Sequence, residues 1–257
     1  MLELRNIDKT FHRGTVNEAP LFRNFSLHVS AGDFVSVVGS NGSGKTTLLN
    51  LISGTVPTDS GEIWLCGEDI TRQAEYRRAV RIGRVYQDPA VGTVPGMTIY
   101  ENLSVAENKN RRYTLGLMLN RRKYEEFREL VRTLGLGLEE KMNIPVGLLS
   151  GGQRQALSLL MSTMTPIDLL LLDEHTAALD PKTAEVIMEL TDRIVREKGI
   201  TAIMVTHNLR YAVEYGNRLL MFHQGGIVFS ADGEKKKCTR VEDILTLFNE
   251  ISVECGN

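Results

Sequence analysis

Cysteine is scarce in this chain, and long apolar runs are missing from it. The three cysteines among its 257 residues, Cys66, Cys238 and Cys255, lie far apart and form no CxxC pair. They therefore indicate neither a disulfide framework nor a zinc site, and they favour a reducing compartment. No apolar run approaches the ~20 residues needed to cross a bilayer, and the N-terminus, charged from its third residue, is not typical of a signal peptide. If the protein acts at a membrane, another polypeptide must span it.

An excess of charge of one sign is also missing. The formal net charge is −2, and 24% of the residues are charged, which is ordinary for a globular protein. Three short basic clusters are typical of solvated surface and predict no nucleic-acid partner; they are Arg111-Arg112, Arg121-Arg122-Lys123 and Lys235-Lys236-Lys237. The sequence shows no internal repeat and no low-complexity segment, so we expect one domain over residues 1–257.

Strand and helix patterns alternate along most of the chain, which predicts an α/β fold. Short apolar runs at residues 34–38, 169–172 and 201–205 are typical of buried parallel strands. Between the last two lies a helix, for which Asp180 is the expected N-cap, Pro181 the first turn, and Gly199 the residue just past the end.

Three further regions differ from this core. Residues 2–7, 25–29 and 61–65 alternate like antiparallel strands, and residues 12–20 read as a surface loop. Apolar residues at helical spacing from Tyr124 to Leu134 predict an inserted helical subdomain at about 88–164. A short C-terminal tail at about 231–257 carries a further helix pattern from Val241 to Phe248.

A glycine-rich segment after the first buried strand matches the pattern G-x-x-x-x-G-K-[ST]. Its glycines let backbone N–H groups turn towards phosphate oxygens, and the following helix directs its positive end at the same anion. Lys45 can reach the β- and γ-phosphates, and the Thr46 hydroxyl can bind Mg²⁺. The expected nucleotide-binding residues are Gly39, Ser40, Asn41, Gly42, Ser43, Gly44, Lys45, Thr46 and the adjacent Thr47. This loop alone is equally compatible with a kinase, a GTPase or an ATPase.

The second buried strand ends in two carboxylates, Asp173 and Glu174. Asp173 is placed to hold Mg²⁺, and Glu174, one residue further out, to take a proton from an attacking water. Such residues can also simply end a strand, but a phosphate loop in the same chain favours the catalytic interpretation.

The segment Leu149-Ser-Gly-Gly-Gln-Arg-Gln155 is the most specific in the chain. Ser150 and Gln153 form an S-x-x-Q capping box before an apolar helix, and Gly151 and Gly152 leave the backbone open to a phosphate of another molecule. This segment resembles the signature sequence of ABC ATPases, and the resemblance covers nearly the whole chain.

That resemblance implies roles for four more residues. Phe11 corresponds to the aromatic residue that stacks on adenine, and Gln87 to the glutamine that senses Mg²⁺ and the attacking water and contacts the membrane subunit. Asp180 corresponds to the loop that links two active sites, and His207 to the histidine that contacts the γ-phosphate. Two positions depart from the family: His175 stands where proline is usual, and Ala177 replaces a common serine. His175 is then either a subgroup marker, which we favour, or a residue that tunes Glu174 electrostatically.

For the whole protein, the resemblance implies a P-loop NTPase core with a mixed or parallel sheet, a small N-terminal antiparallel β subdomain and an inserted α-helical subdomain. Two ATP-binding subunits would face head to tail, each ATP and Mg²⁺ lying between one phosphate loop and the other copy's signature. The expected partners are transmembrane permease subunits, a second copy or a related ATPase subunit, and an extracytoplasmic substrate-binding protein. The expected location is the cytoplasmic face of the cell membrane, and the expected activity is ATP hydrolysis driving import of a small organic solute such as an amino acid. An exporter or lipid-extraction ATPase, and a soluble ATPase of iron–sulfur assembly, remain alternatives.

Overall fold

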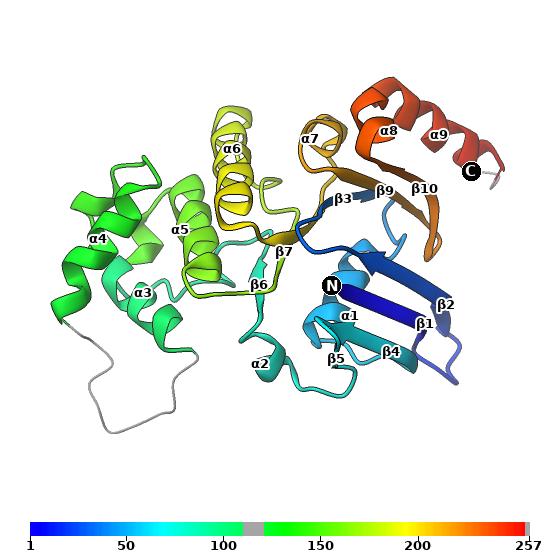
Figure 1. Ribbon diagram of the computed structural model, residues 1–257, viewed down its shortest axis with the longest axis horizontal. Coiled ribbons are helices and arrows are strands. Elements are labelled where there is room, and N and C mark those ends of the chain that lie inside the picture. Colours follow the sequence, from blue (N-terminus) through cyan, green and yellow to red (C-terminus); the bar gives the residue numbers. More distant parts are fainter. Residues whose placement is uncertain (110–120, 255–257) are drawn as a thin grey trace. The chain divides into compact units, whose positions relative to one another are not determined.

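The computed structural model describes residues 1–109 and 121–254, and the chain divides into two compact units. The first unit joins Met1–Ala79 to Gly199–Asn257, and the second is Val80–Lys198 (Figure 1). Arg111, Arg112 and Cys255 lie outside the described residues. Each unit combines helices with strands, so the α/β class predicted from the sequence is confirmed.

An antiparallel sheet in the first unit contains the three strands predicted from alternation. Its order is β2-β1-β4-β5, formed by Ala19–Val29, Leu2–Phe11, Ser60–Leu65 and Glu68–Asp69. Leu2, Leu4 and Ile7 of β1 are all buried, although Leu4 and Ile7 are an odd number of residues apart. A register shift between them, with Asn6 at φ +51°, turns the Ile7 side chain back to the buried face of the sheet. The loop expected at 12–20 is shorter, because β2 begins at Ala19.

A second set of strands in the first unit surrounds β3 (Phe34–Gly39). Its neighbours β8 (Thr201–Val205) and β9 (Arg218–His223) are both parallel to it, and β10 (Gly226–Asp232) is antiparallel to β9. Every residue of β3 and β8 is buried. This explains why their sequences are apolar without alternation.

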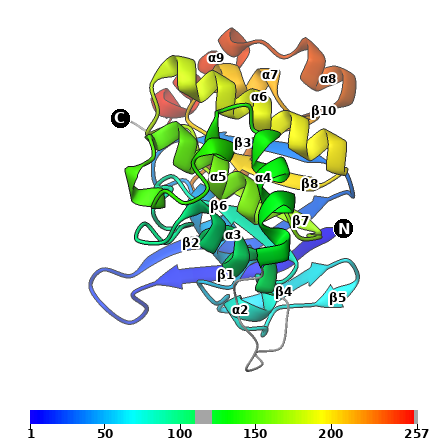
Figure 2. The same cartoon turned by 90° about the vertical axis from the view of Figure 1, so that its left-hand side faces the viewer.

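The first unit contains the helices α1 (Lys45–Ser53), α2 (Glu75–Arg78), α7 (Leu209–Glu214), α8 (Gly233–Cys238) and α9 (Val241–Glu254). Of these, α1 and α7 contact β3, and α8 contacts β9 and β10. Val38 and Met221 of the strands pack with Ala212 of α7 and Ile244 of α9 in one buried cluster. Within this unit, α7, α8 and α9 lie on one side of β3, β9 and β10, and the antiparallel sheet lies on the other (Figures 1 and 2).

The second unit contains the parallel strands β6 (Ile82–Val85) and β7 (Leu169–Asp173). Its helices are α3 (Ile99–Asn108), α4 (Tyr124–Arg132), α5 (Gly151–Thr163) and α6 (Pro181–Lys198), with single 3₁₀ turns at Arg121–Lys123, Leu138–Glu140 and Val146–Leu148. α5 packs against β6, α3 and α6. Phe127 and Val131 on α4, and Leu134 after it, are buried as their helical spacing predicted.

Across the residues that the structure describes, no helix is long and apolar enough to cross a membrane. The helical segment predicted at about 88–164 lies within the second unit, and its extent as a separate subdomain stays a prediction.

Candidate nucleotide-binding site

The phosphate loop lies in the first unit, between the end of β3 and the start of α1. Gly42 and Gly44 have φ of +78° and +106°, conformations that side chains other than glycine rarely adopt. At Gly39, a Cβ would lie 2.3 Å from the Phe222 carbonyl oxygen and 2.8 Å from Ser43 Oγ. The glycines predicted from the motif are therefore required by the backbone itself. Asn41, Gly42 and Thr46 are exposed, so this side of the loop is open to a ligand.

Two polar groups buried in this loop fit an anionic ligand. Lys45 is 5% exposed, and its Nζ donates to the carbonyl oxygens of Gly39 at 2.8 Å and Ser40 at 2.9 Å. The hydroxyl of Ser43 is buried and has no hydrogen-bond partner among the described residues. A buried, unpaired hydroxyl is costly unless a ligand or water satisfies it. A phosphate group bound at the loop would supply both an acceptor for Ser43 and a counter-charge for Lys45.

His207 lies beside the same loop. β8 pairs with β3, and the Thr206 N–H that follows it donates to the Val37 carbonyl at 3.1 Å. A cavity of about 310 Å³ is lined by Gly39, Ser40 and Asn41 of the loop and by His207. Phe248 of α9 closes part of the same cavity. The structure thus brings together two motifs that are more than 160 residues apart in the sequence.

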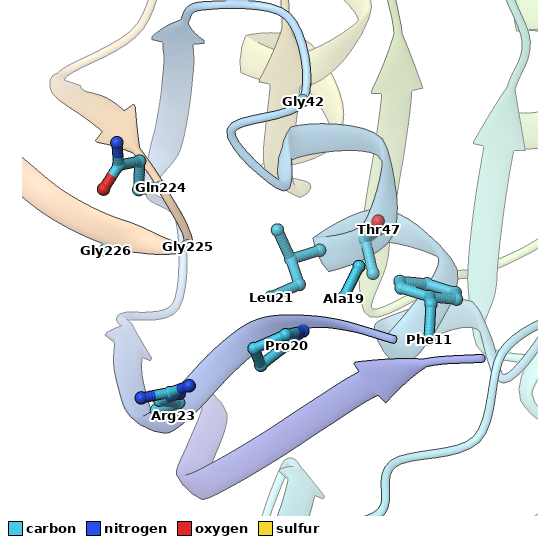
Figure 3. A pocket seen from close by; sticks show the side chains of 10 residues that line it. All are labelled: Phe11, Ala19, Pro20, Leu21, Arg23, Gly42, Thr47, Gln224, Gly225 and Gly226. Atoms are coloured by element: carbon cyan, nitrogen blue, oxygen red, sulfur yellow. The ribbon is translucent and has the colours of Figure 1, made fainter. Parts of the chain in front are cut away.

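A larger pocket of about 800 Å³ lies on another side of the loop and contains Phe11 (Figure 3). Its lining comes from β1, β2, the phosphate loop, the start of α1 and the β9–β10 turn: Phe11, Ala19, Pro20, Leu21, Arg23, Gly42, Thr47, Gln224, Gly225 and Gly226. Phe11 and Gln224 lie at opposite ends of it, with Leu21 and Thr47 between them. An aromatic ring in a pocket shared with Gly42 and Thr47 is suited to stacking on a nucleotide base.

The β9–β10 turn in this pocket was missed by the sequence reasoning. Its Gly225 N–H donates to the Ser43 carbonyl at 3.0 Å, and a Cβ on Gly225 would lie 1.7 Å from the Leu21 carbonyl oxygen. The turn therefore supports the phosphate loop from a distant part of the chain. The sequence Gln-Gly-Gly after an apolar strand signals the turn itself, although it does not say which loop the turn touches.

The carboxylates lie in the second unit, at the carboxyl end of β7. Asp173 is 8% exposed, and its Oδ2 pairs with Arg84 Nη2 of the adjacent strand β6 at 3.1 Å. The Arg84 guanidinium also lies 4.6 Å from the centroid of the Tyr86 ring. Sequence reasoning missed Arg84, although a charged residue inside a buried strand is a signal, because such a charge requires a partner.

Glu174 follows in a left-handed conformation, with φ of +48°. Its carbonyl accepts the Ala177 N–H at 2.9 Å, so the chain turns sharply immediately after β7. His175 is buried, and burial lowers its pKa to about 4. The imidazole is thus neutral near pH 7 and supplies no positive charge to Glu174.

Gln87 is exposed just after β6, and the segment that carries it is tied to α5. Gln155 Nε2 of α5 donates to the Tyr86 carbonyl at 3.1 Å. The predicted capping box at the start of α5 is present: Ser150 Oγ accepts the Gln153 N–H, and Gln153 Oε1 accepts the Ser150 N–H, both at 3.3 Å. The signature segment and the glutamine segment therefore share one helix as their support.

Gly152 of the signature and Asp180 also have local structural reasons. A Cβ on Gly152 would lie 2.2 Å from Thr183 Cγ2 of α6, so close packing of the helices requires glycine there. Asp180 Oδ1 accepts the Thr183 N–H at 3.1 Å, and hydrogen bonding to the Thr183 side chain, together with this backbone bond, lowers the pKa of Asp180. Asp180 is thus the N-cap that its sequence predicted. Ser150 remains exposed at the tip of α5.

The donor set suits magnesium better than a transition metal. The candidate ligands, the Thr46 hydroxyl, the Asp173 carboxylate and the Gln87 side chain, are oxygen donors. Mg²⁺ typically takes one or two carboxylates together with phosphate oxygens and water. Within the described ranges, no group of three or more His, Cys, Asp or Glu side chains could hold a metal by itself. The residues therefore fit an ion that arrives with a nucleotide. The individual roles of the predicted site residues stay predictions.

Comparisons with known proteins find relatives over nearly the full chain. The ABC transporter family model matches residues 22–177. The tyrosine transport ATP-binding protein of Clostridioides difficile is 48% identical over 96% of this chain and 98% of that protein. The xylose/arabinose import ATP-binding protein XylG of Sulfolobus acidocaldarius is 31% identical, and the match covers 100% of this chain and 98% of that protein. Among solved structures, a dimeric post-hydrolysis state of the ATP-binding cassette MJ0796 bound to ADP and Pi matches with a TM-score of 0.75; it is 28% identical, and the match covers 90% of this chain and 98% of that one.

Proposed function

From the premise that this chain belongs to the ABC transporter family, of which it is an ATP-binding and ATP-hydrolysing member, we propose that it energises the import of a small organic solute through separate transmembrane subunits. An amino acid is the favoured solute class, because the C. difficile relative is named as a tyrosine transport protein. Import is favoured because the S. acidocaldarius relative is named as an import protein.

The observation that carries the ATP-binding part of this proposal is the phosphate loop, with its buried Lys45 ammonium and a Ser43 hydroxyl that has no hydrogen-bond partner in the part of the chain that the structure describes. Lys45 would exchange its bonds to the loop carbonyls for the β- and γ-phosphates, and Phe11 would stack on the adenine. The Thr46 hydroxyl, the Asp173 carboxylate and Gln87 would hold Mg²⁺, which when bound neutralises charge on the β- and γ-phosphate oxygens.

Hydrolysis requires a base for the attacking water. Glu174 would take a proton from that water as the water oxygen attacks the γ-phosphorus. The bond from the γ-phosphorus to the bridging oxygen then breaks, and ADP leaves with that electron pair. Gln87 would orient the water, and His207 would donate a hydrogen bond to the γ-phosphate.

A second copy, or a related ATPase subunit, would complete the site. Ser150 and the amides of Gly151 and Gly152 would contact the γ-phosphate bound by the partner copy, while Asp180 would link the two sites. The exposure of Ser150 and Asp180 supports this role. ATP then binds the closed pair more tightly than the open pair, so hydrolysis lets the pair reopen.

Transmembrane permease subunits are the proposed partners, with attachment at the cytoplasmic face of the membrane and an extracytoplasmic substrate-binding protein in the same system. One surface of the second unit supports this docking. Four apolar side chains with exposures of 37–77% form a docking patch, defined as Val91, Val94, Ile144 and Leu148. Backbone bonds from Gly147 N–H to the Pro95 carbonyl and from Ile99 N–H to the Ile144 carbonyl hold its two segments side by side. The patch begins four residues after Gln87.

The substitution Glu174→Gln tests the proposed base. Glutamine keeps the shape of glutamate but cannot take the proton, so the rate of ATP hydrolysis should fall at least about a hundred-fold. ATP affinity should persist, and Mg-ATP should trap a dimer detectable by size-exclusion chromatography. Glu189→Gln, at an exposed position of α6, is the matched control and should hydrolyse normally. Normal hydrolysis by Glu174→Gln would remove Glu174 from the role of base.

Purification in detergent separates the alternatives. A transporter subunit should co-purify with a membrane protein, whereas an ATPase of iron–sulfur assembly should not. Transport assays in proteoliposomes containing the whole complex then distinguish import from export by the direction in which labelled amino acid moves.

A further inference from the structure

The backbone of Glu174 is held in a conformation that is unfavourable for its residue type. A φ of +48° places Glu174 in the left-handed region, which side chains with a Cβ disfavour. Such a conformation persists only where the surroundings enforce it, and it often occurs at functional sites. Something near Glu174 must therefore fix this turn.

The next residue provides that contact. His175 is 2% exposed, and its Nε2 lies 3.1 Å from the hydroxyl oxygen of Thr191, which is fully buried on α6. The Thr191 hydroxyl already donates its hydrogen to the Ile187 carbonyl at 2.7 Å. Its oxygen must therefore act as the acceptor towards histidine, which places the ring hydrogen on Nε2. Each polar hydrogen in this short chain of bonds has one acceptor.

The segment after β7 is consequently fixed to α6 at two points. His175 holds its beginning at Thr191, and Asp180 holds its end at the Thr183 N–H. Thr183 and Thr191 are eight residues apart on one helix, a distance of about 12 Å along its axis. Residues 174–180 are thus held at one end by the start of α6 and at the other by Thr191, about two turns further along that helix.

We propose that His175 is a positioning residue for ATP hydrolysis, whose hydrogen bond to Thr191 anchors the turn that carries Glu174 to α6. This inference rests on the proposed role of Glu174 as the base. The anchor acts on the orientation of Glu174 and not on nucleotide affinity. Loss of the anchor should therefore lower kcat and leave KM for ATP nearly unchanged.

Thr191→Val is the primary test, because valine keeps the shape of threonine and removes the acceptor. We expect kcat to fall about ten-fold, with KM for ATP within about two-fold of the wild-type value. Thr191→Ser, which restores the hydroxyl, should recover most of the rate. Thr163→Val is the matched control: Thr163 is equally buried on α5, and its hydroxyl donates to the carbonyl four residues back, Leu159, at 2.9 Å.

Hydrogen exchange gives a readout that does not depend on catalysis. In Thr191→Val, the amides of residues 174–180 should exchange at least about five-fold faster than in the wild type, whereas Thr163→Val should leave them unchanged. If the two valine variants match in both kcat and exchange, the anchor is only a packing contact and the proposal fails.

A double variant tests the role of His175 separately from the role of Glu174 as the base. In Glu174→Gln protein, adding Thr191→Val should not lower the residual rate further, because the anchor acts through Glu174. A further ten-fold loss in that background would show that His175 acts elsewhere and would overturn the inference. If Glu174→Gln alone hydrolyses ATP normally, the proposed base is wrong, while the exchange result still reports whether the anchor holds the turn.

Discussion

Arg84 and Asp173 form an ion pair in the second unit whose side chains are only 10% and 12% exposed. A carboxylate so poorly hydrated is costly unless a cation compensates it. Arg84 supplies that charge from the neighbouring strand and stacks on Tyr86, the residue before Gln87. One guanidinium thus connects the proposed metal ligand to the segment that carries the proposed glutamine.

Replacing Arg84 by methionine should destabilise the protein markedly. Removing Arg84 takes away a positive charge that lies 3.1 Å from the poorly hydrated Asp173 carboxylate, and we expect the free energy of unfolding to fall by about 3 kcal/mol. The measurement is urea unfolding followed by circular dichroism. Arg81→Met is the matched control: Arg81, just before β6, pairs with Asp168, just before β7, but these side chains are 30% and 37% exposed, so less than about 1 kcal/mol should be lost. Equal losses for the two variants would contradict this account of Arg84.

At the scale of elements, α8 is fastened to the end of α7 by one buried lysine. Lys236 is 4% exposed, and its Nζ donates to the carbonyls of Val213 at 2.9 Å, Tyr215 at 2.7 Å and Gly216 at 3.0 Å. The last carbonyls of a helix lack partners within the helix, so a cation there is favourable. Burial nevertheless lowers the pKa of Lys236 to about 8.

That pKa predicts how stability depends on pH. An unfolded lysine keeps its proton up to a pH of about 10.4, so between pH 8 and 10 the unfolded chain binds more protons than the folded chain. Stability contributed through Lys236 must therefore rise with pH in this window. From pH 7 to pH 9.5, the free energy of unfolding of the wild type relative to Lys236→Met should increase by about 2 kcal/mol.

The exposed neighbour Lys237, paired with Glu234, is the matched control for this measurement. The difference between the wild type and Lys237→Met should stay constant over the same pH range. A difference for Lys236→Met that is flat, or that shrinks as pH rises, would rule out the lowered pKa.

Elements set by local sequence were predictable, whereas contacts between distant elements were not. The strand, loop and helix from Phe34 to Ser53 follow from an apolar run, glycines and a helix pattern that are consecutive in the chain. The Asp180 cap and the box of Ser150 with Gln153 are equally local. By contrast, the contact of Gly225 with Ser43 depends on how β9 and β10 pair. No pattern within either segment records that pairing.

At the scale of the whole molecule, the predicted site residues divide between the two units. The phosphate loop, Phe11 and His207 belong to the first, and Gln87, Asp173, Glu174 and the signature belong to the second. The sequence indicated which chemistry each group offers, because each motif is contiguous. It could not indicate the supports of these groups, such as Arg84 for Asp173 or Thr191 for His175, because parallel strand register and packing on α6 decide those contacts.

The docking patch allows a test of how the molecule connects to a membrane partner. Leu148 is 77% exposed, and burying its side chain against a permease would stabilise the complex by roughly 2 kcal/mol. Leu148→Glu would place a charge in that contact, so the permease should be lost on purification in detergent, while ATP binding and thermal stability of the free chain stay unchanged. Val228→Glu changes another exposed apolar residue, 47% exposed on β10 and outside the patch, and should retain the permease. Retention of the permease by both variants would show that the membrane partner binds another surface.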